Sequence, residues 1–351
     1  MFMRIAHIIW ALETGGAETM LVDIVNAQAA TQDVSLFIVN DKIDRALLEK
    51  ISPRCELYCI GRKPGSRNPM PWIRLNLELA RYKPDVIHFH LEGLRRMVFN
   101  PAPKVFTIHN IHTSGREYPS FQALYAISDG VRKYTEKQGF ESVTVWNGIR
   151  TEDVSRKDGS PYHPGDECRI VCAGRLYTPH KGQDILVEAL AMLRDKGIRN
   201  FHLDFIGDGE SAGNLEKMVG DLGLSDKVTF RGRRDREWIY AHLRDYDLSV
   251  LPSRSEGFGL SVAEAMCAKV PVLVCDLDGA LDVIDGGRLG MTFRTGDTAS
   301  LAGRIASFIG KGGDERVLDE ALDYARTHFD IRITAERYIE EYGKTLARCR
   351  K

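Results

Sequence analysis

Between residues 251 and 266 the chain reads Leu-Pro-Ser-Arg-Ser-Glu-Gly-Phe-Gly-Leu-Ser-Val-Ala-Glu-Ala-Met. An apolar run ends at the start of this segment, a loop with two glycines follows, and a helical pattern begins near Gly259. A strand, a short loop and a helix in this order are part of the βαβ unit from which parallel sheets are built. The same order recurs along the whole chain. The sequence therefore predicts an α/β fold whose parallel sheets are covered by helices on both faces.

The alternation of strands and helices forms two series, which predicts two domains. A length of 351 residues favours the same number. Between the series, residues 151–167 lack periodicity and are rich in turn-forming residues. We expect one Rossmann-like, doubly wound domain over residues 1–150 and a second over residues 151–330. Strands are expected at 4–10, 34–40, 56–60, 86–89, 105–108, 124–127 and 143–146, then at 169–173, 202–206, 227–230, 248–251 and 270–275.

The residues after Thr298 have the pattern of three helices. The last of them, residues 331–348, is long enough to return to the first domain, so residues 331–351 are expected to complete it. In open parallel sheets, ligands bind at the carboxyl ends of the strands. We therefore expect the chemistry in a cleft where the two domains face each other.

The composition excludes several classes of protein. Apolar residues make up 43% of the chain and charged residues 28%, as in globular proteins, and no apolar run approaches the roughly 20 residues of a membrane-spanning helix. The net charge of −1 gives no sign of a nucleic-acid partner. Seven cysteines without a Cys-x-x-Cys pair, and a start without a signal peptide, indicate a cytoplasmic protein with reduced thiols.

The loop within residues 251–266 has the features of a phosphate site. Gly257 and Gly259 allow a ligand to approach the backbone closely, and the N–H groups of the following helix favour an anion. Glu256 and Glu264 flank this loop, and carboxylates beside a phosphate suit a ligand rich in hydroxyl groups, such as a sugar with a ribose. The alternative is an ordinary loop with one surface carboxylate and one that interacts with the helix dipole.

Two cations follow an earlier strand of the same domain. Arg175 can bind two phosphate oxygens at once, and Lys181 adds a second positive charge six residues later. Such a pair suits a diphosphate leaving group and removes the need for Mg²⁺, although exposed cations in a loop are often only solvated. The glycines of residues 207–213 have the spacing G-x-G-x-x-x-G, which does not match the dinucleotide fingerprint, so NAD is rejected.

The first domain offers further candidates. Gly15 and Gly16 leave room for a ligand that reaches across from the other domain, or form a simple tight turn. His109 comes directly after an expected strand and is our candidate for contact with the reacting sugar. His88 and His90 form a His-x-His pattern, but no Cys or carboxylate lies at a suitable spacing, so we expect no metal site.

Taken in order, these segments resemble the retaining glycosyltransferases of the GT-B fold, specifically glycosyltransferase family 4, also called group 1. The segment from Glu256 to Glu264 is similar to the E-x7-E signature of that family. The resemblance covers nearly the whole chain and is strongest over residues 169–293. The other segments that carry it are 15–18, His109, 146–149, 174–176 with Lys181 and Gly182, and 207–209.

The resemblance implies a role for each domain and for single residues. The second domain would hold a nucleotide-diphosphate sugar, and the first would supply the acceptor site. Catalytic roles fall to His109, Glu256, Arg175 and Lys181, with Glu256 reading hydroxyls of the donor sugar and the two cations gripping the diphosphate. Contacts to the nucleotide sugar are implied for Gly15, Gly16, Gly207, Arg231, Gly257, Phe258, Gly259, Leu260 and Glu264, with Arg231 near the base and Glu264 on the ribose.

The implied reaction is sugar transfer with retention of anomeric configuration, without a metal or other cofactor, in the synthesis of a polysaccharide or glycoconjugate. The donor would be a UDP-sugar, with GDP left open, and the acceptor a glycan or a lipid-linked molecule. Two positions depart from the family pattern, because Asp282 stands where a glutamate is usual and Asn110 where an acid is usual. A sugar-nucleotide epimerase and a non-catalytic nucleotide-sugar-binding subunit are the alternatives.

The positive charge of the first domain is concentrated in one region. Residues 61–104 contain nine Lys and Arg residues against three Asp and Glu residues. This basic region is either a solvated helix face or a docking surface for anionic lipid at the inner face of the membrane.

Overall fold

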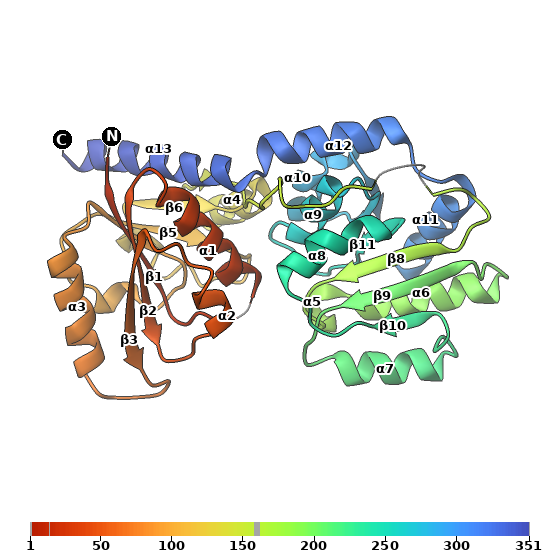
Figure 1. Cartoon of the computed structure of the whole chain (residues 1–351), viewed down its shortest axis with the longest axis horizontal. Helices are drawn as coiled ribbons and strands as arrows, with labels where there is room; N and C mark the ends of the chain where they lie inside the picture. Colours follow the sequence, from red (N-terminus) through yellow and green to blue (C-terminus); the bar gives the residue numbers. More distant parts are fainter. Residues whose placement is uncertain (1, 14, 158–161, 351) are drawn as a thin grey trace. The chain divides into compact units, whose positions relative to one another are not determined.

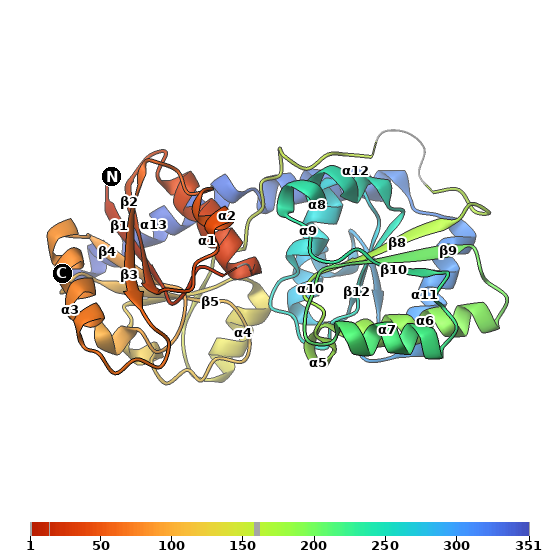
Figure 2. The same cartoon turned by 60° about the horizontal axis from the view of Figure 1, so that its bottom comes forward.

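The computed structural model describes residues 2–13, 15–157 and 162–350, and these form two compact units (Figures 1 and 2). Unit 1 combines the chain up to Ile149 with the segment from Asp330 onward, and unit 2 is Arg150–Phe329. Part of the expected linker, residues 158–161, and Thr14 beside Gly15 lie outside the described residues.

Unit 1 is built on a seven-stranded sheet with the order β3-β2-β1-β4-β5-β6-β7. All neighbouring strands run parallel, and the order reverses between β1 and β4. The expected strands of the first series are confirmed, with β7 shorter than predicted. The strands are β1 (Arg4–Ile9), β2 (Asp33–Asn40), β3 (Cys55–Arg62), β4 (Val86–Phe89), β5 (Lys104–Ile108), β6 (Ala123–Ala126) and β7 (Val143–Thr144).

The final helix, α13 (Ile331–Cys349), belongs to unit 1 and lies along it in both views (Figures 1 and 2). It packs against α1, and its Tyr338 and Tyr342 are buried in the same apolar core as β1 and α1. The backbone N–H of Ile331 donates to the carbonyl oxygen of Ile149 at 2.9 Å, where the chain returns to the unit. The other helices are α1 (Gly16–Gln28), α2 (Arg45–Leu48), α3 (Met70–Tyr82) and α4 (Asp129–Lys137), with short 3₁₀ turns at Arg95–Met97 and Tyr118–Ser120.

Unit 2 contains a six-stranded parallel sheet with the order β10-β9-β8-β11-β12-β13. Its order reverses between β8 and β11. The strands are β8 (Cys168–Ala173), β9 (Phe201–Ile206), β10 (Val228–Phe230), β11 (Leu248–Leu251), β12 (Val272–Cys275) and β13 (Met291–Phe293), the last of which the sequence did not predict. The helices are α5 (Thr178–Lys181), α6 (Gln183–Asp195), α7 (Ala212–Asp221), α8 (Arg236–His242), α9 (Leu260–Cys267), α10 (Asp278–Val283), α11 (Thr298–Lys311) and α12 (Glu315–His328), with 3₁₀ turns at Leu243–Asp245 and Asp285–Gly287.

The apolar runs from which the strands were predicted are buried in the cores of the two units. Along β1, every residue from Ile5 to Ile9 is buried, and β11 is buried over its whole length. Strands buried on both faces need continuous apolar runs, which is why the runs were visible in the sequence. Among the described residues, no helix combines the length and the apolar character needed to cross a membrane.

Candidate functional site

The loops at the carboxyl ends of β8 and β9 pack backbone against backbone. Gly207 has φ +145°, and a Cβ at this position would collide with the carbonyl oxygen of Gly174. The Leu176 N–H donates to the Asp208 carbonyl at 2.7 Å, so the two loops are held together over several residues. Gly207 therefore has a packing role that is sufficient to explain a glycine there, and its contact with a ligand stays a prediction.

The loop after β8 also meets the loop after β11. Gly182 has φ +63°, and a Cβ there would collide with the carbonyl oxygen of Pro252. The Arg254 N–H donates to the His180 carbonyl at 2.7 Å. Helix α6 begins at Gln183, so Lys181 lies at the C-terminal end of the short helix α5 and not in the first turn of α6. This close approach of two loops places Lys181 beside Glu256.

Lys181 and Glu256 form an ion pair, with 2.7 Å between Nζ and Oε2. The side chain of Glu256 is only 10% exposed and that of Lys181 33%. The Ser253 hydroxyl donates to the same carboxylate oxygen at 3.1 Å. Burial acts to lower the pKa of Lys181, but the Glu256 carboxylate more than offsets it, so the pKa is raised and Lys181 stays a cation.

Arg175 has a different carboxylate partner. Its Nε donates to Glu210 Oε2 at 3.2 Å, and its Nη2 donates to the other oxygen of Glu210. Both side chains are well exposed. In the described part of the chain, no hydrogen bond or ion pair joins Arg175 to Lys181, so each cation is neutralised separately. Glu210 was not predicted as a partner from the sequence, although it follows the glycine-rich end of a predicted strand.

The start of α9 has the expected character of an anion site. Gly259 precedes the helix with φ +101°, and no described side chain caps the first N–H groups of the helix. Unpaired amides at a helix start attract negative charge. The backbone of Gly257 and Leu260 belongs to this turn, whereas the ring of Phe258 is buried and lies edge-on to Phe329 with 5.2 Å between centroids. Phe258 can therefore offer a ligand only its main chain.

Glu264 and Arg231 are both engaged with residues that sequence analysis missed. Glu264 is buried on α9, with its Oε1 3.5 Å from Arg236 Nε. Arg231 Nε donates to Asp204 Oδ2 at 2.9 Å, and the same oxygen accepts from the Tyr246 hydroxyl at 2.7 Å. Asp204 lies within β9, so its side chain is visible as a partner only once the strands are paired.

In unit 1, Gly15 precedes α1 and Gly16 is its first residue. Gly15 has an extended backbone, and a Cβ there would collide with the carboxylate of Glu18, which folds back over the helix start. Burial raises the pKa of this carboxyl group. This contact concerns Gly15 alone and involves the end of a flexible side chain, and the contact of Gly15 and Gly16 with a ligand stays a prediction.

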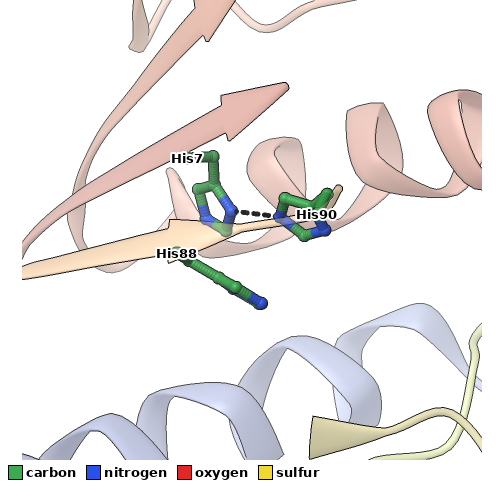
Figure 3. A group of neighbouring side chains, drawn as sticks. All are labelled: His7, His88 and His90. Carbon is green, nitrogen blue, oxygen red and sulfur yellow. Dashed lines mark hydrogen bonds between the residues drawn. The ribbon is translucent and has the colours of Figure 1, made fainter. Parts of the chain in front are cut away.

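Histidines gather where the strand order of unit 1 reverses (Figure 3). His7 of β1 is paired in register with His88 of β4, and His90 and His109 follow the ends of β4 and β5. The sequence pattern singles out His88, His90 and His109, whereas His7 lies within an apolar strand and carries no such signal. Burial lowers the pKa of His7 and of His109 to about 4 and holds those of His88 and His90 well below the ordinary value, so all four rings are neutral at pH 7.

The ligand atoms of His7, His88 and His90 lie within 4.8 Å of one another, as in a metal site. All six of their ring nitrogens, however, already have hydrogen-bond partners. His88 bonds to the hydroxyls of Tyr342 at 2.6 Å and Thr107 at 2.7 Å, and the nitrogens of His7 and His90 bond to each other and to neighbouring side chains. A metal ion held by all three rings would have to displace at least two of these bonds, whereas the network leaves each ring nitrogen with a partner.

Comparison with known proteins gave consistent results for both units. A family model described as "Glycosyl transferases group 1" matches residues 167–311, and one described as "Glycosyltransferase Family 4" matches residues 14–153. The chain is 27% identical to the phosphatidyl-myo-inositol mannosyltransferase of Mycobacterium leprae over 64% of each chain. It is 26% identical to the lipopolysaccharide core biosynthesis glycosyltransferase LpsD of Rhizobium meliloti, over 99% of this chain and all of that one.

Three curated relatives, with the Mycobacterium leprae protein among them, are matched over less than two thirds of their own length. The shares are 64%, 38% and 46%. Among solved structures, Anabaena HepE in complex with UDP and glucose is similar, with a TM-score of 0.80 and 21% identity over 97% of this chain and 99% of that one. At this identity the similarity establishes the fold, with two Rossmann-like domains.

Proposed function

The chain belongs to the group 1 glycosyltransferases of family 4, and from this we propose that it transfers a sugar from a nucleotide-diphosphate sugar to an acceptor hydroxyl. The ion pair of Lys181 and Glu256, beside the uncapped start of α9, carries the proposal. A cation and helix amides suit a diphosphate, and a carboxylate at the same place suits sugar hydroxyls.

We assign the diphosphate to Arg175, Lys181 and the main chain of residues 257–260. Arg175 would exchange Glu210 for phosphate oxygens, a step of low cost because exposed ion pairs contribute little. Lys181 can remain in contact with Glu256 while it binds phosphate, since an ammonium group has three donors. Glu256 would accept hydrogen bonds from hydroxyls of the donor sugar, Glu264 would accept them from the ribose, and His109 would orient the sugar. Gly15, Gly16, Gly207 and Arg231 complete the proposed contacts.

The proposed reaction proceeds with retention and without a metal. The bond from the anomeric carbon to the diphosphate oxygen breaks, and the bond from that carbon to the acceptor oxygen forms on the same face. The departing phosphate oxygen takes the acceptor proton. The positive charges and amides around the diphosphate stabilise the charge that develops on it, which is the role Mg²⁺ would otherwise have.

For the substrates, the names of relatives favour two nucleotides and lipid or glycan acceptors. HepE was solved with UDP and glucose, whereas a mannosyltransferase of Mycobacterium tuberculosis is named as GDP-mannose-dependent. The relatives from Mycobacterium leprae and Rhizobium meliloti are named for a phosphatidylinositol and for lipopolysaccharide core. We propose a UDP-sugar donor, with GDP as the second choice, and a glycan or lipid-linked acceptor in glycoconjugate synthesis.

The experiment is a panel of UDP- and GDP-sugars tested for thermal stabilisation in the presence of a chelator. A donor that binds only the folded protein raises the melting temperature. We expect one nucleotide series to stabilise the protein, and the stabilising sugar to be transferred when acceptors are added. The absence of stabilisation by every donor would contradict the proposal, and conversion of the donor alone to an epimer would favour an epimerase.

We further propose that α3 brings the protein to an anionic membrane surface as a peripheral protein on the cytoplasmic side. Met70, Ile73 and Leu77 are 61%, 49% and 54% exposed, at the i, i+3, i+7 spacing of one helix face. Arg74 and Arg81 are exposed on the same helix, within the basic region 61–104. Apolar side chains next to arginines are typical of a helix that lies in the headgroup layer.

Sedimentation with vesicles that contain anionic lipid tests this surface. We expect binding at low salt that weakens as salt is added and is reduced in the double variant Ile73→Ser, Leu77→Ser. The control is Ile333→Ser, since Ile333 is an exposed residue of α13 outside the basic region. Equal binding of the wild type, the double variant and Ile333→Ser would contradict the role of α3.

A further inference from the structure

A chain of hydrogen bonds runs beneath His109. Gln28 Oε1 lies 2.8 Å from His7 Nε2, and His7 Nδ1 lies 3.0 Å from His90 Nε2, the contact drawn in Figure 3. His90 Nδ1 then lies 3.3 Å from His109 Nε2. Gln28, His7 and His90 are buried, whereas His109 is half-buried. The chain thus connects the end of α1 to the carboxyl ends of β4 and β5.

Each imidazole in this chain is neutral, because burial lowers the pKa of all three rings. A neutral imidazole carries one N–H and one bare nitrogen, so it donates at one end and accepts at the other. When three such rings are hydrogen-bonded in series, every ring must therefore donate in the same direction along the series. The direction of the whole chain is set at its buried end.

The group at that end is the Gln28 side chain. A carbonyl oxygen only accepts, so with Oε1 facing His7 the proton is on His7 Nε2 and the lone pair on Nδ1. His90 Nε2 must then donate to His7, and His109 Nε2 must donate to His90. The remaining nitrogen, His109 Nδ1, carries a lone pair and has no hydrogen bond to any described residue.

We propose that Gln28 is a positioning residue that fixes the tautomer of His109 through His7 and His90, so that Nδ1 accepts a hydrogen bond from a hydroxyl of the donor sugar. The proposal rests on the proposed function for the identity of that hydroxyl, but not for the tautomer. If the Gln28 amide were turned over, its N–H would donate to His7 and every bond in the chain would reverse. His109 Nδ1 would then carry the proton and would donate a hydrogen bond to the hydroxyl oxygen instead of accepting one from it.

A metal site accounts for these histidines less well than the hydrogen-bond relay, by which we mean the series from Gln28 through His7 and His90 to His109. The relay uses both nitrogens of His7 and both of His90, at ordinary hydrogen-bond distances. His88 is turned to α13 instead, where it meets the hydroxyl of Tyr342 (Figure 3). A divalent ion among three neutral rings would also be buried without an anion, which is costly.

The test is nuclear magnetic resonance of the full chain with ¹⁵N-labelled histidine, since two-bond ¹H–¹⁵N spectra show which ring nitrogen is protonated. We expect the proton on Nε2 of His7, His90 and His109 in the protein without substrate. In Gln28→Leu the chain loses its fixed end, and we expect a second tautomer of His109 to appear. Gln28→Met, which keeps the side-chain length, gives the same readout if the leucine variant folds poorly.

The matched control is Gln32→Leu. Gln32 lies just beyond the same helix and accepts from the Met3 N–H at 2.8 Å, outside the relay. A His109 proton on Nδ1 in the wild type, or equal tautomer ratios in the Gln28 and Gln32 variants, would overturn the proposal. We expect the kcat/KM of transfer to fall by roughly 3- to 10-fold in Gln28→Leu, about the value of one hydrogen bond.

The outcomes also separate this proposal from the proposed function. The tautomers are measured without a donor, so a protein that binds no nucleotide sugar can still show the expected relay. Conversely, a protein that transfers sugar with His109 protonated on Nδ1 would overturn the relay alone.

Discussion

The two units place different chemistry at the same point of the same topology. Each sheet reverses its strand order beside its first strand, between β1 and β4 in unit 1 and between β8 and β11 in unit 2. In unit 1 this point holds buried, neutral imidazoles that bond to one another, and in unit 2 it holds a lysine paired with a carboxylate. The difference follows from burial, because a buried group either becomes neutral or requires an opposite charge.

The largest expected effect is that of Lys181→Ala in unit 2. It leaves the nearly buried Glu256 carboxylate without a cation and removes a charge from the proposed diphosphate site. We expect the rate of sugar transfer to fall by about 10²- to 10³-fold, as for other groups that stabilise transition-state charge. Steady-state kinetics below the melting temperature measure the loss.

The control for this variant is Lys227→Ala. Lys227 forms a comparable pair with Glu167, with 3.2 Å between Nζ and Oε1, away from the candidate site. If both variants lost the same fraction of activity, or if Lys181→Ala kept full activity, the charged site of unit 2 would have no catalytic role.

As the pH is lowered, unit 1 is expected to lose stability at a higher pH than unit 2. The pKa of His7 and of His109 is about 4 in the folded protein against 6.5 when exposed, so the unfolded chain binds more protons between these values. The stability that these rings contribute is therefore complete above about pH 6.5 and is lost as the pH falls toward 4. Lys181 is charged throughout this range, because its pKa is raised.

Hydrogen exchange followed by mass spectrometry at pH 7 and pH 5 measures this difference. We expect peptides of β1 and β4 to lose protection at pH 5, while those of β8 and β11 keep it, since local opening is resolved by this method. Earlier loss in unit 2 would contradict the assignment of neutral, buried histidines.

The smallest effect concerns the exposed pair of Arg175 and Glu210. Because both side chains are exposed, Glu210→Gln is expected to leave the free energy of unfolding nearly unchanged. The affinity for the donor should be equal or higher, since Arg175 no longer has to leave a carboxylate. Glu340→Gln, which removes the exposed partner of Arg337 in unit 1, is the control for urea unfolding.

A clear loss of stability in Glu210→Gln that Glu340→Gln does not show would indicate that Arg175 has a structural role. Titration with nucleotide diphosphate measures the affinity, and weaker binding would show that Glu210 itself contributes to the site.

The sequence predicted the strands well where they are buried on both faces. The bounds of β4 and β11 match the predicted ranges, because each is a short apolar run between turn formers. It missed β13 and α10, of three and six residues, which are too short to show a period. It also missed α5, a single turn of four residues that ends at Lys181.

For the candidate site, the sequence located side chains but not their partners. Lys181, Glu256 and His109 follow strands, so a local pattern reveals them. His7 and His90 are 83 residues apart, and Arg175 and Glu210 are 35 apart. Such pairs depend on strand register and on loop packing, which no local pattern contains. His7 in particular looked like one more core residue of an apolar strand.

The return of α13 to unit 1 has a consequence for synthesis on the ribosome. Tyr338 and Tyr342 cover the face of the sheet that holds His88, yet they are made after the whole of unit 2. During translation that face lacks the part of its cover that α13 supplies while residues 150–329 are added. The contacts of His88 with Tyr338 and Tyr342 therefore form only after α13 has been synthesised.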